Sequence, residues 1–329
     1  MRKLFLLMAA ILVMVVFTSC GTQEESTVDT DSLPTVRVAA MRGPTALGLL
    51  SLMDEHRLGN TILNYDFELL GSPDEVPPLF VRGEIDIAAV PGNLAAVLYN
   101  RLDGELKALA VVTLGVLHIV DTTGEINSVA DLAGRTIFSS GQGATPEFAL
   151  NYVLSQNGLE PGVDVFVEFR AEHTEIAALL ETGQAEIALL PEPFVSTVLA
   201  RIDGLRLALD LTEEWDRVQP NYGLIMSVVV ARREFVENYP EAVEILMREY
   251  ADSIEFVNSN VAEAATLAVD FEIIPNMAIA ESALPRTHIV FLTGEEKRRN
   301  LLGFYNVLYL AEPASIGGEM PDDNFFFIP

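Results

Sequence analysis

Residues 79–104, LFVRGEIDIAAVPGNLAAVLYNRLDG, are repeated one hundred positions later as residues 179–204, LLETGQAEIALLPEPFVSTVLARIDG. Each copy reads as a helix that ends at a glycine, a short apolar run broken by one acid, a proline that interrupts the sheet ladder, and a second helix. An apolar run of this length is typical of a largely buried strand. The identical pairs share one offset: Leu79 and Leu179, Gly83 and Gly183, Ile87 and Ile187, Ala88 and Ala188, Pro91 and Pro191, Arg101 and Arg201, Asp103 and Asp203, Gly104 and Gly204.

Two copies of one helix–turn–strand–loop–helix unit predict two similar lobes. The loops that follow the two strands, 91–93 and 191–193, lie at strand carboxyl ends, where open α/β sheets bind ligands. If the lobes face each other, both loops face the same cleft. The alternative is that the units are alike only because all strand–helix units are alike. The uninterrupted offset favours two lobes.

Composition limits the class of protein. The 329 residues allow two domains, and a hydrophobic fraction of 50% argues against global disorder. The formal charge is −28, with 48 acidic and 20 basic residues. Self-repulsion of this size keeps a protein soluble and repels phosphate backbones, so we expect no nucleic-acid partner.

The N-terminus predicts export and lipidation. Residues 1–19 have a basic start and an apolar run too short for a membrane span, as in a signal peptide. The single cysteine, Cys20, follows directly, and an unpaired cysteine in an exported protein needs an explanation. Residues 20–33 are mostly polar and predict a flexible tether. We expect Cys20 to carry the lipid that holds an extracytoplasmic body to the membrane.

The remaining pattern predicts an α/β fold with a discontinuous first lobe. Apolar runs at 106–112 and 116–120 carry the chain out of lobe one, and the run at 222–230 returns it. The predicted division is 34–117 and 228–329 for lobe one and 118–227 for lobe two. Each lobe is expected to contain a mixed sheet flanked by helices. Two connecting strands predict a hinge.

Two threonines are predicted to start helices at the cleft. Thr145 precedes Pro146 and Glu147, which is the order of cap, first helical proline and first-turn acid. Thr45 stands in a similar position. Helix N-termini present unpaired N–H groups, so both threonines predict anion-receptive sites. Gly141 and Gly143 would let the backbone approach a ligand closely.

The chain resembles the solute-binding lipoproteins of ABC importers, in the nitrate/sulfonate/taurine group of type II periplasmic binding proteins. Phe17 stands where the lipobox of such proteins usually has leucine. The resemblance covers about residues 34–310 and does not specify the ligand. The matching stretches are FTSCG at 17–21, Gly-x-Ile/Ala-Asp/Glu-Ile-Ala in both copies, ADLAGRTI at 130–137, GQGATPE at 141–147, PEPF at 191–194 and FVENYPE at 235–241.

The resemblance implies the two-lobe type II periplasmic-binding-protein fold, with a ligand held between the lobes by loops that follow the strands. It implies no catalytic residue, no metal and no cofactor. Carried over residue by residue, it assigns to the ligand site Arg42, Gly43, Thr45, Ser72, Asn93, Thr113, Ser140, Gln142, Gly143, Thr145, Glu192, Asn221 and Tyr222.

Several of these residues also have a purely structural interpretation. Arg42 could pair with an anionic group of the ligand or, equally, with an acidic side chain on the surface. Glu192 could pair with a cationic ligand group or favour a helix N-terminus. Tyr222 and Trp215 could stack on a ring, although a single tryptophan in a helix is more often a core residue. Arg170 and His173 follow a strand but are interpreted as solvated surface. The other histidines, His56, His118 and His288, lack metal-ligand spacing.

We expect the protein to capture a small organic anion or polar heterocycle and to deliver it to a membrane permease. We expect it to act as a monomer and not to be an enzyme. One alternative is a sensor domain that presents the ligand to a membrane receptor. A biosynthetic enzyme on the same scaffold is a further alternative, but it would need a reactive side chain, and the only cysteine is assigned to the lipid.

Overall fold

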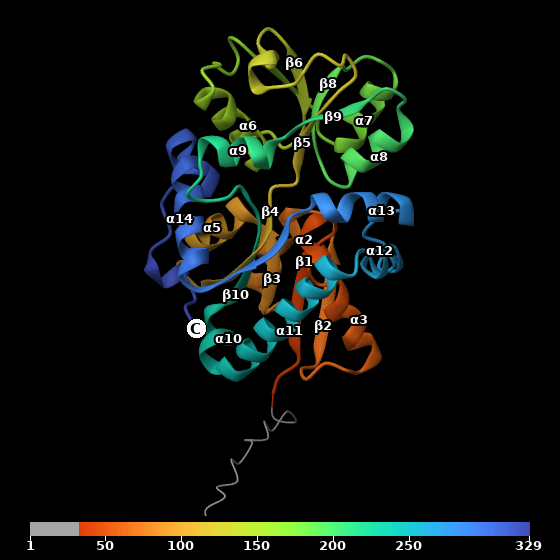
Figure 1. Cartoon of the computed structure of the whole chain (residues 1–329). Coiled ribbons are helices and arrows are strands. Elements are labelled where there is room, and N and C mark those ends of the chain that lie inside the picture. The colour runs from red at the N-terminus through yellow and green to blue at the C-terminus, as the bar shows by residue number, and fades with distance from the viewer. Residues whose placement is uncertain (1–32) are drawn as a thin grey trace, which may run out of the picture. The chain divides into compact units, whose positions relative to one another are not determined.

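The computed structural model describes residues 33–329, of which Pro34–Pro329 form one unit. The predicted signal peptide, Cys20 and the tether up to residue 32 lie outside the described residues. None of the described helices is both long enough and apolar enough to cross a membrane. The fold class is confirmed: the body contains two mixed sheets flanked by helices (Figure 1).

The first sheet has six strands in the order β11-β4-β10-β3-β1-β2. β1 pairs in parallel with β2 and β3, whereas β10 runs antiparallel to both β3 and β4. Its central strands are almost entirely apolar, as expected for a sheet covered on both faces. The strands are β1 (Val36–Met41), β2 (Tyr65–Leu70), β3 (Ile87–Pro91), β4 (Leu106–Leu114), β10 (Ile225–Arg232) and β11 (Ile289–Leu292).

The second sheet has five strands in the order β7-β6-β8-β5-β9. β6 is parallel to β7 and β8, and β5 is antiparallel to β8 and β9. The two sheets therefore have the same arrangement. In each, the parallel strands pair with one antiparallel strand, β10 or β5, which begins where the chain has just crossed from the other sheet. The strands are β5 (Leu117–Asp121), β6 (Thr136–Ser139), β7 (Phe166–Phe169), β8 (Ile187–Pro191) and β9 (Arg206–Asp210).

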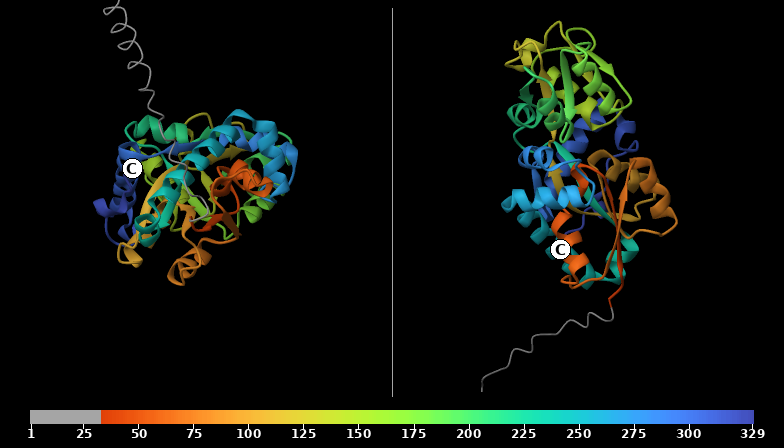
Figure 2. Two further views of the ribbon diagram at one scale, coloured as in Figure 1. Left: turned by 90° about the horizontal axis from the view of Figure 1, so that it is seen from below. Right: turned by 90° about the vertical axis from the view of Figure 1, so that its right-hand side faces the viewer.

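Helices cover the sheets, and the C-terminal helices all follow β10 (Figures 1 and 2). Those between the strands of the first sheet are α2 (Pro44–Leu47), α3 (Leu50–Leu58), α4 (Val76–Val81) and α5 (Gly92–Arg101). Those of the second sheet are α6 (Thr145–Gln156), α7 (His173–Glu181), α8 (Phe194–Arg201) and α9 (Leu211–Val218). The C-terminal set is α10 (Arg233–Asn238), α11 (Pro240–Ser259), α12 (Val261–Asp270), α13 (Met277–Ala283) and α14 (Gly294–Ala311).

The sequence repeat forms the predicted unit twice, as α4-β3-α5 and α7-β8-α8. Gly83 and Gly183 both end their helix with a positive φ, 66° and 70°, which a left-handed cap requires. One detail of the prediction is wrong. Pro91 and Pro191 do not interrupt the ladder, because each is the last residue of its strand and still has a strand partner, Ser227 and Leu117 respectively.

The chain passes between the sheets through residues 115–116 and again through residues 219–224. β5 begins at Leu117 and β10 at Ile225, close to the predicted lobe boundaries of 118 and 228. The division into lobes at those positions stays a prediction. At the first crossing, Gly115 leaves no room for a side chain, since a β-carbon there would lie 1.9 Å from Thr212 Oγ1.

The C-terminal tail packs on the first sheet. Phe325 is buried against Tyr99, with ring centroids 4.8 Å apart, and the Phe327 N–H donates to the Ala108 carbonyl. Lys297 of α14 is buried beneath this tail. Its Nζ donates to the backbone carbonyls of Ala108 at 2.7 Å, Leu109 at 3.0 Å and Phe327 at 2.5 Å. This buried amino group joins the tail to β4.

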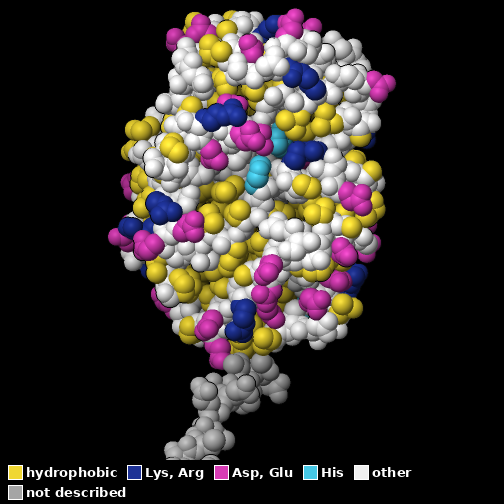
Figure 3. All heavy atoms as spheres, viewed as in Figure 1, with side chains coloured by type: hydrophobic (Ala, Val, Ile, Leu, Met, Phe, Trp, Pro, Cys, Tyr) yellow, Lys and Arg dark blue, Asp and Glu magenta, His cyan; other side chains and the backbone are white. Residues whose placement is uncertain are grey.

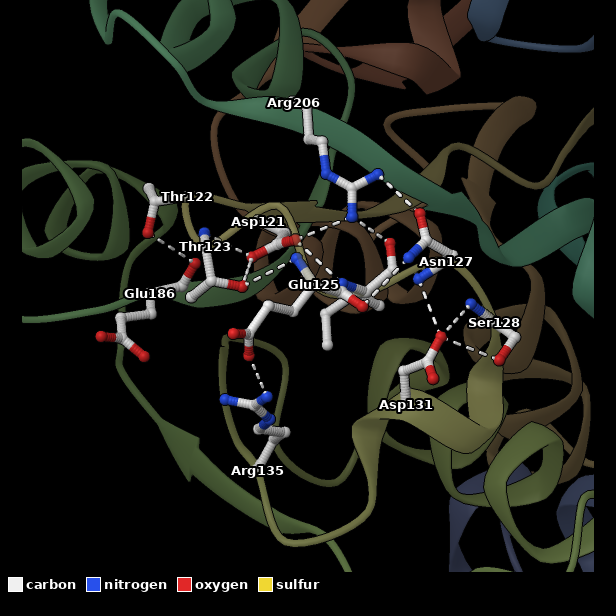
Figure 4. A network of polar contacts seen from close by, with 11 residues as sticks. Asp121, Thr122, Thr123, Glu125, Asn127, Ser128, Asp131, Arg135, Glu186 and Arg206 are labelled. Carbon is white, nitrogen blue, oxygen red and sulfur yellow. Dashed lines mark hydrogen bonds and ion pairs between the residues drawn. The ribbon is translucent and has the colours of Figure 1, made fainter.

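Basic side chains lie beside acidic ones over the face seen in Figure 3. Elsewhere on the surface, Arg82 pairs with Glu84 at 2.7 Å. A partly buried ion pair, Arg206 with Asp121, lies at the last residue of β5 (Figure 4). There the Asp121 carboxylate accepts from Arg206 at 3.0 Å and from the Ile126 N–H at 3.2 Å. Burial favours a higher pKa of Asp121, but the hydrogen bonds from Thr123, Ile126 and Arg206 outweigh it and lower the pKa. They also join β5 to the loop that leads to β6.

We predict that Gly115→Ala destabilises the protein by about 1–3 kcal/mol, because the new methyl group must displace Thr212. Chemical denaturation would measure the change. Gly71→Ala is the matched control, because a β-carbon at Gly71 meets nothing closer than 3.6 Å. Adding Thr212→Ala should recover part of the loss, and no recovery would contradict the proposed clash.

A second prediction concerns Lys297, whose pKa is lowered to about 7 by burial, with the charge of Glu295 opposing the shift. Between pH 7 and the unfolded-state pKa of 10.5, the unfolded chain binds a proton that the folded chain has released. The free energy of unfolding should therefore rise with pH in this window, by up to ~1.4 kcal/mol per pH unit. Lys297→Met should lose this contribution. Equal slopes for the two proteins between pH 7 and 9 would show that Lys297 stays charged.

Candidate functional site

In the first sheet, the predicted site residues follow the carboxyl ends of β1 and β3. Arg42 comes directly after β1, and Asn93 lies in the first turn of α5 after β3. Thr113 is buried near the end of β4, in register with Ser227 of β10, which itself pairs with Pro91. One edge of the first sheet thus presents these polar positions.

In the second sheet, the corresponding edge is formed by the ends of β6, β7 and β8, which run in parallel. Ser140 follows β6, and Glu192 follows β8; both are buried. Thr145 is the first residue of α6. The loops after the parallel strands therefore supply the polar groups in both sheets, as the sequence predicted.

The two edges meet at Asn93 and Thr145. The Thr145 hydroxyl donates to Asn93 Oδ1 at 3.4 Å, and Asn93 Nδ2 donates to the Ser315 carbonyl at 3.2 Å. This long hydrogen bond joins two predicted site residues that lie 52 positions apart and belong to different sheets. The loop edge of one sheet consequently faces the loop edge of the other.

The helix starts differ from the prediction. Thr145 is not an N-cap: Ala144 takes that position and contributes no side-chain hydrogen bond. Thr45 lies inside α2, a helix of only four residues whose N-cap is Gly43. The prediction that Thr45 starts a helix is therefore wrong, and so short a helix has no appreciable dipole to attract an anion. A role of Thr45 in ligand binding stays a prediction.

Ser140 forms a pair that the sequence did not predict. Its hydroxyl lies 2.5 Å from Nδ1 of His173, the first residue of α7, and the imidazole packs against Phe194 with ring centroids 4.7 Å apart. Burial lowers the pKa of His173 to about 4. A neutral imidazole with so low a pKa is a weak general base at neutral pH, so the pair is better suited to hydrogen bonding than to activating Ser140.

Glu192 is the most heavily bonded of the predicted residues. Its side chain is 1% exposed and lies 2.6 Å from Arg286 Nε. Its other oxygen accepts from the Ser196 hydroxyl at 2.7 Å and the Ser196 N–H at 3.1 Å. Of the two sequence interpretations, favouring a helix N-terminus is consistent with the Ser196 contact. The Arg286 contact was not foreseen.

A histidine lies buried beside this pair. His118 of β5 is 0% exposed, and neither ring nitrogen has a hydrogen-bond partner among the described residues. Asp210 lies 3.7 Å from Nδ1. Burial lowers the pKa of His118, while Asp210 and Glu192 oppose the shift. Opposite it, His288 Nδ1 donates to the Gly115 carbonyl at the first crossing.

Three other predicted residues are exposed or have their hydrogen-bond partners elsewhere. Arg42 is exposed and donates to the Glu272 carbonyl at 3.3 Å, with no carboxylate partner among residues 33–329. Ser72 stays within its own turn, where its N–H donates to Glu75 at 2.7 Å. Asn221 is exposed in the second crossing. The structure does not bring these three residues into contact with the Asn93–Thr145 pair.

Gln142, Gly143 and Tyr222 line a groove between α6 and α14 with a volume of about 860 Å³. The Tyr222 ring lies against Gly303 of α14, where a β-carbon would approach it to 2.2 Å. Trp215 is fully buried, so the core interpretation of this tryptophan is confirmed. Part of the predicted set thus lies at the facing loop edges and part in this groove, whereas Arg42, Ser72 and Asn221 contact neither.

Residues 60–217 match the family described as phosphonate-binding periplasmic substrate-binding proteins of ABC transporters. The chain is homologous to periplasmic substrate-binding proteins of ABC transporters. No curated protein sequence matches it. Among residues 33–329, no three His, Cys, Asp or Glu side chains are placed to hold a metal ion.

Solved structures agree with this relationship in fold. An ABC transporter protein from Parabacteroides distasonis has a TM-score of 0.74 and 24% identity, over 90% of this chain and 98% of that chain. The aliphatic sulphonate binding protein of Escherichia coli has a TM-score of 0.71 and 15% identity, over 91% and 93%. The nitrate-binding protein of Synechocystis has a TM-score of 0.54 and 14% identity, over 72% and 66%.

We predict that His173 titrates near pH 4 in the folded protein, because its buried ring disfavours the charged form. NMR of the imidazole ring protons would measure the midpoint, and His173→Gln would assign the signal. A midpoint at or above pH 6 would show that the ring is solvated and would contradict its place in the site.

Proposed function

We propose that the protein captures a small solute between its two sheets and presents it to the permease of an ABC importer. The observation that supports this most directly is the meeting of the two loop edges at Asn93 and Thr145. In open α/β sheets, ligands bind at strand carboxyl ends. A solute held there contacts both sheets at once, so its binding favours the conformation in which the edges are close.

The site that we propose for the solute is built mainly from uncharged groups. Asn93, Thr145, Ser140 and the neutral ring of His173 can each donate or accept a hydrogen bond. Phe194 adds an aromatic face beside His173. The predicted ligand, a small organic anion or a polar heterocycle, is compatible with these groups, and Arg42 would supply the charge that an anion needs.

The homologous proteins are periplasmic, which implies a location outside the cytoplasm. We propose further that Cys20 carries a lipid anchor, that residues 20–33 tether the body to the membrane and that the protein acts as a monomer. Replacing Cys20 by serine should release the exported protein from the membrane fraction. No known catalytic arrangement accompanies the Ser140–His173 pair, and we propose binding rather than catalysis.

A thermal-shift screen of nitrate, phosphonates, sulfonates, pyrimidines and flavins tests the proposed function. A ligand present at a hundredfold excess over its Kd should stabilise the folded state by about 2.7 kcal/mol. If the ligand is an anion, Arg42→Ala should weaken its binding. Arg101→Ala, at the far end of α5, is the control for loss of an exposed arginine. A screen in which no compound raises the melting temperature would count against solute capture by this group of ligands.

A further inference from the structure

Glu192 occupies the position that corresponds to Gly92 in the other sequence copy. A side chain is impossible at Gly92, because a β-carbon would lie 2.9 Å from the Ile225 carbonyl oxygen. In the second sheet, the same position carries a buried carboxylate. The two loop edges come from the same repeated unit, but they differ in charge at the equivalent positions 92 and 192.

The Glu192 carboxylate uses the donors of Arg286, which lies at the end of the short 3₁₀ turn Leu284–Arg286 before β11. Arg286 Nε donates to Glu192 at 2.6 Å. Arg286 Nη2 donates to the hydroxyls of Ser196 at 2.7 Å and Ser282 at 2.9 Å. Ser196 in turn donates to Glu192. The guanidinium is thus held in a closed network that joins α8 to the segment preceding β11.

This network leaves Arg286 poorly suited to bind an anion. A carboxylate, phosphonate or sulfonate binds arginine best through two parallel N–H donors. Nε and Nη2 are already engaged, so an incoming anion could form that fork only by displacing Glu192 from Nε or a serine hydroxyl from Nη2, and Nη1 alone offers no fork. The displaced carboxylate would remain buried with Ser196 alone, and a buried charge that has lost its partner is strongly unfavourable.

We propose that Glu192 is a specificity-determining residue, whose carboxylate is the built-in counter-anion of Arg286 and excludes anionic solute groups from it. A solute group that reaches this network is then expected to be polar and uncharged. His118 supports this assignment, because its buried ring has no hydrogen-bond partner among the described residues. A neutral imidazole can donate to such a group through one nitrogen and accept from it through the other. The inference rests on the proposed function for the identity of the site.

The test compares Glu192→Gln with the wild type in calorimetric titrations with nitrate, sulfate, phosphate, methylphosphonate and ethanesulfonate at constant ionic strength. Glutamine preserves the shape of the side chain and frees the charge of Arg286. We expect at least one anion to bind Glu192→Gln tenfold or more tightly than the wild type. Adding Arg286→Gln should abolish this gain. Glu186→Gln removes an exposed acid just before β8, at the end away from Glu192, and should change nothing.

Two results would overturn the inference: equal anion affinities for Glu192→Gln and the wild type, or loss of wild-type anion binding in Arg286→Gln alone. The second comparison applies even if Glu192→Gln fails to fold. The inference can also fail separately from the proposed function. A wild type that binds a solute while Glu192→Gln gains no anion affinity rejects only the role of Glu192. A gain in Glu192→Gln, with no solute bound by the wild type, supports that role but counts against solute capture.

Discussion

The arrangement of the candidate site depends on how tightly the chain passes from the first sheet to the second. Gly115 lies against Thr212 with no space for a β-carbon, and its carbonyl accepts from His288. The next carbonyl, that of Val116, accepts from the Glu192 N–H. The crossing therefore binds a loop of the second sheet on one side and the segment before β11 on the other. The crossing thus sets the position of the loop edge of each sheet, and a change in the crossing would move both edges.

Local sequence patterns predicted the fold well because the repeat carries its own structural signals. Gly83 and Gly183 mark the helix ends, and the apolar runs form β3 and β8 at almost the predicted positions. The loops that follow those strands supply Asn93 and Glu192. The predictions at Thr45 and Thr145 were less accurate, since a cap depends on backbone angles that the order of residues does not determine.

Two site residues were missed for different reasons. Ser140 directly follows β6, and His173 begins the helix that follows β7, so a rule that selects polar residues between a strand and the next helix start would have included both. His173 was set aside as solvated surface, and only the packing of Phe194 shows otherwise. Arg286 could not have been found, because nothing near it in sequence indicates a buried carboxylate 94 residues away. The C-terminal segment contacts residues far away in the sequence, and local sequence patterns do not predict such contacts.

A natural optical reporter lies next to the second crossing. Trp215 is the only tryptophan in the protein. It is fully buried in α9, and its indole N–H donates to the Tyr222 carbonyl at 2.9 Å. Its ring packs on Tyr152 of α6 at 4.8 Å and near Phe304 of α14 at 6.2 Å. Any rotation of one sheet against the other would alter these neighbours, so the intrinsic fluorescence of the unmodified protein should reveal domain movement without an attached dye.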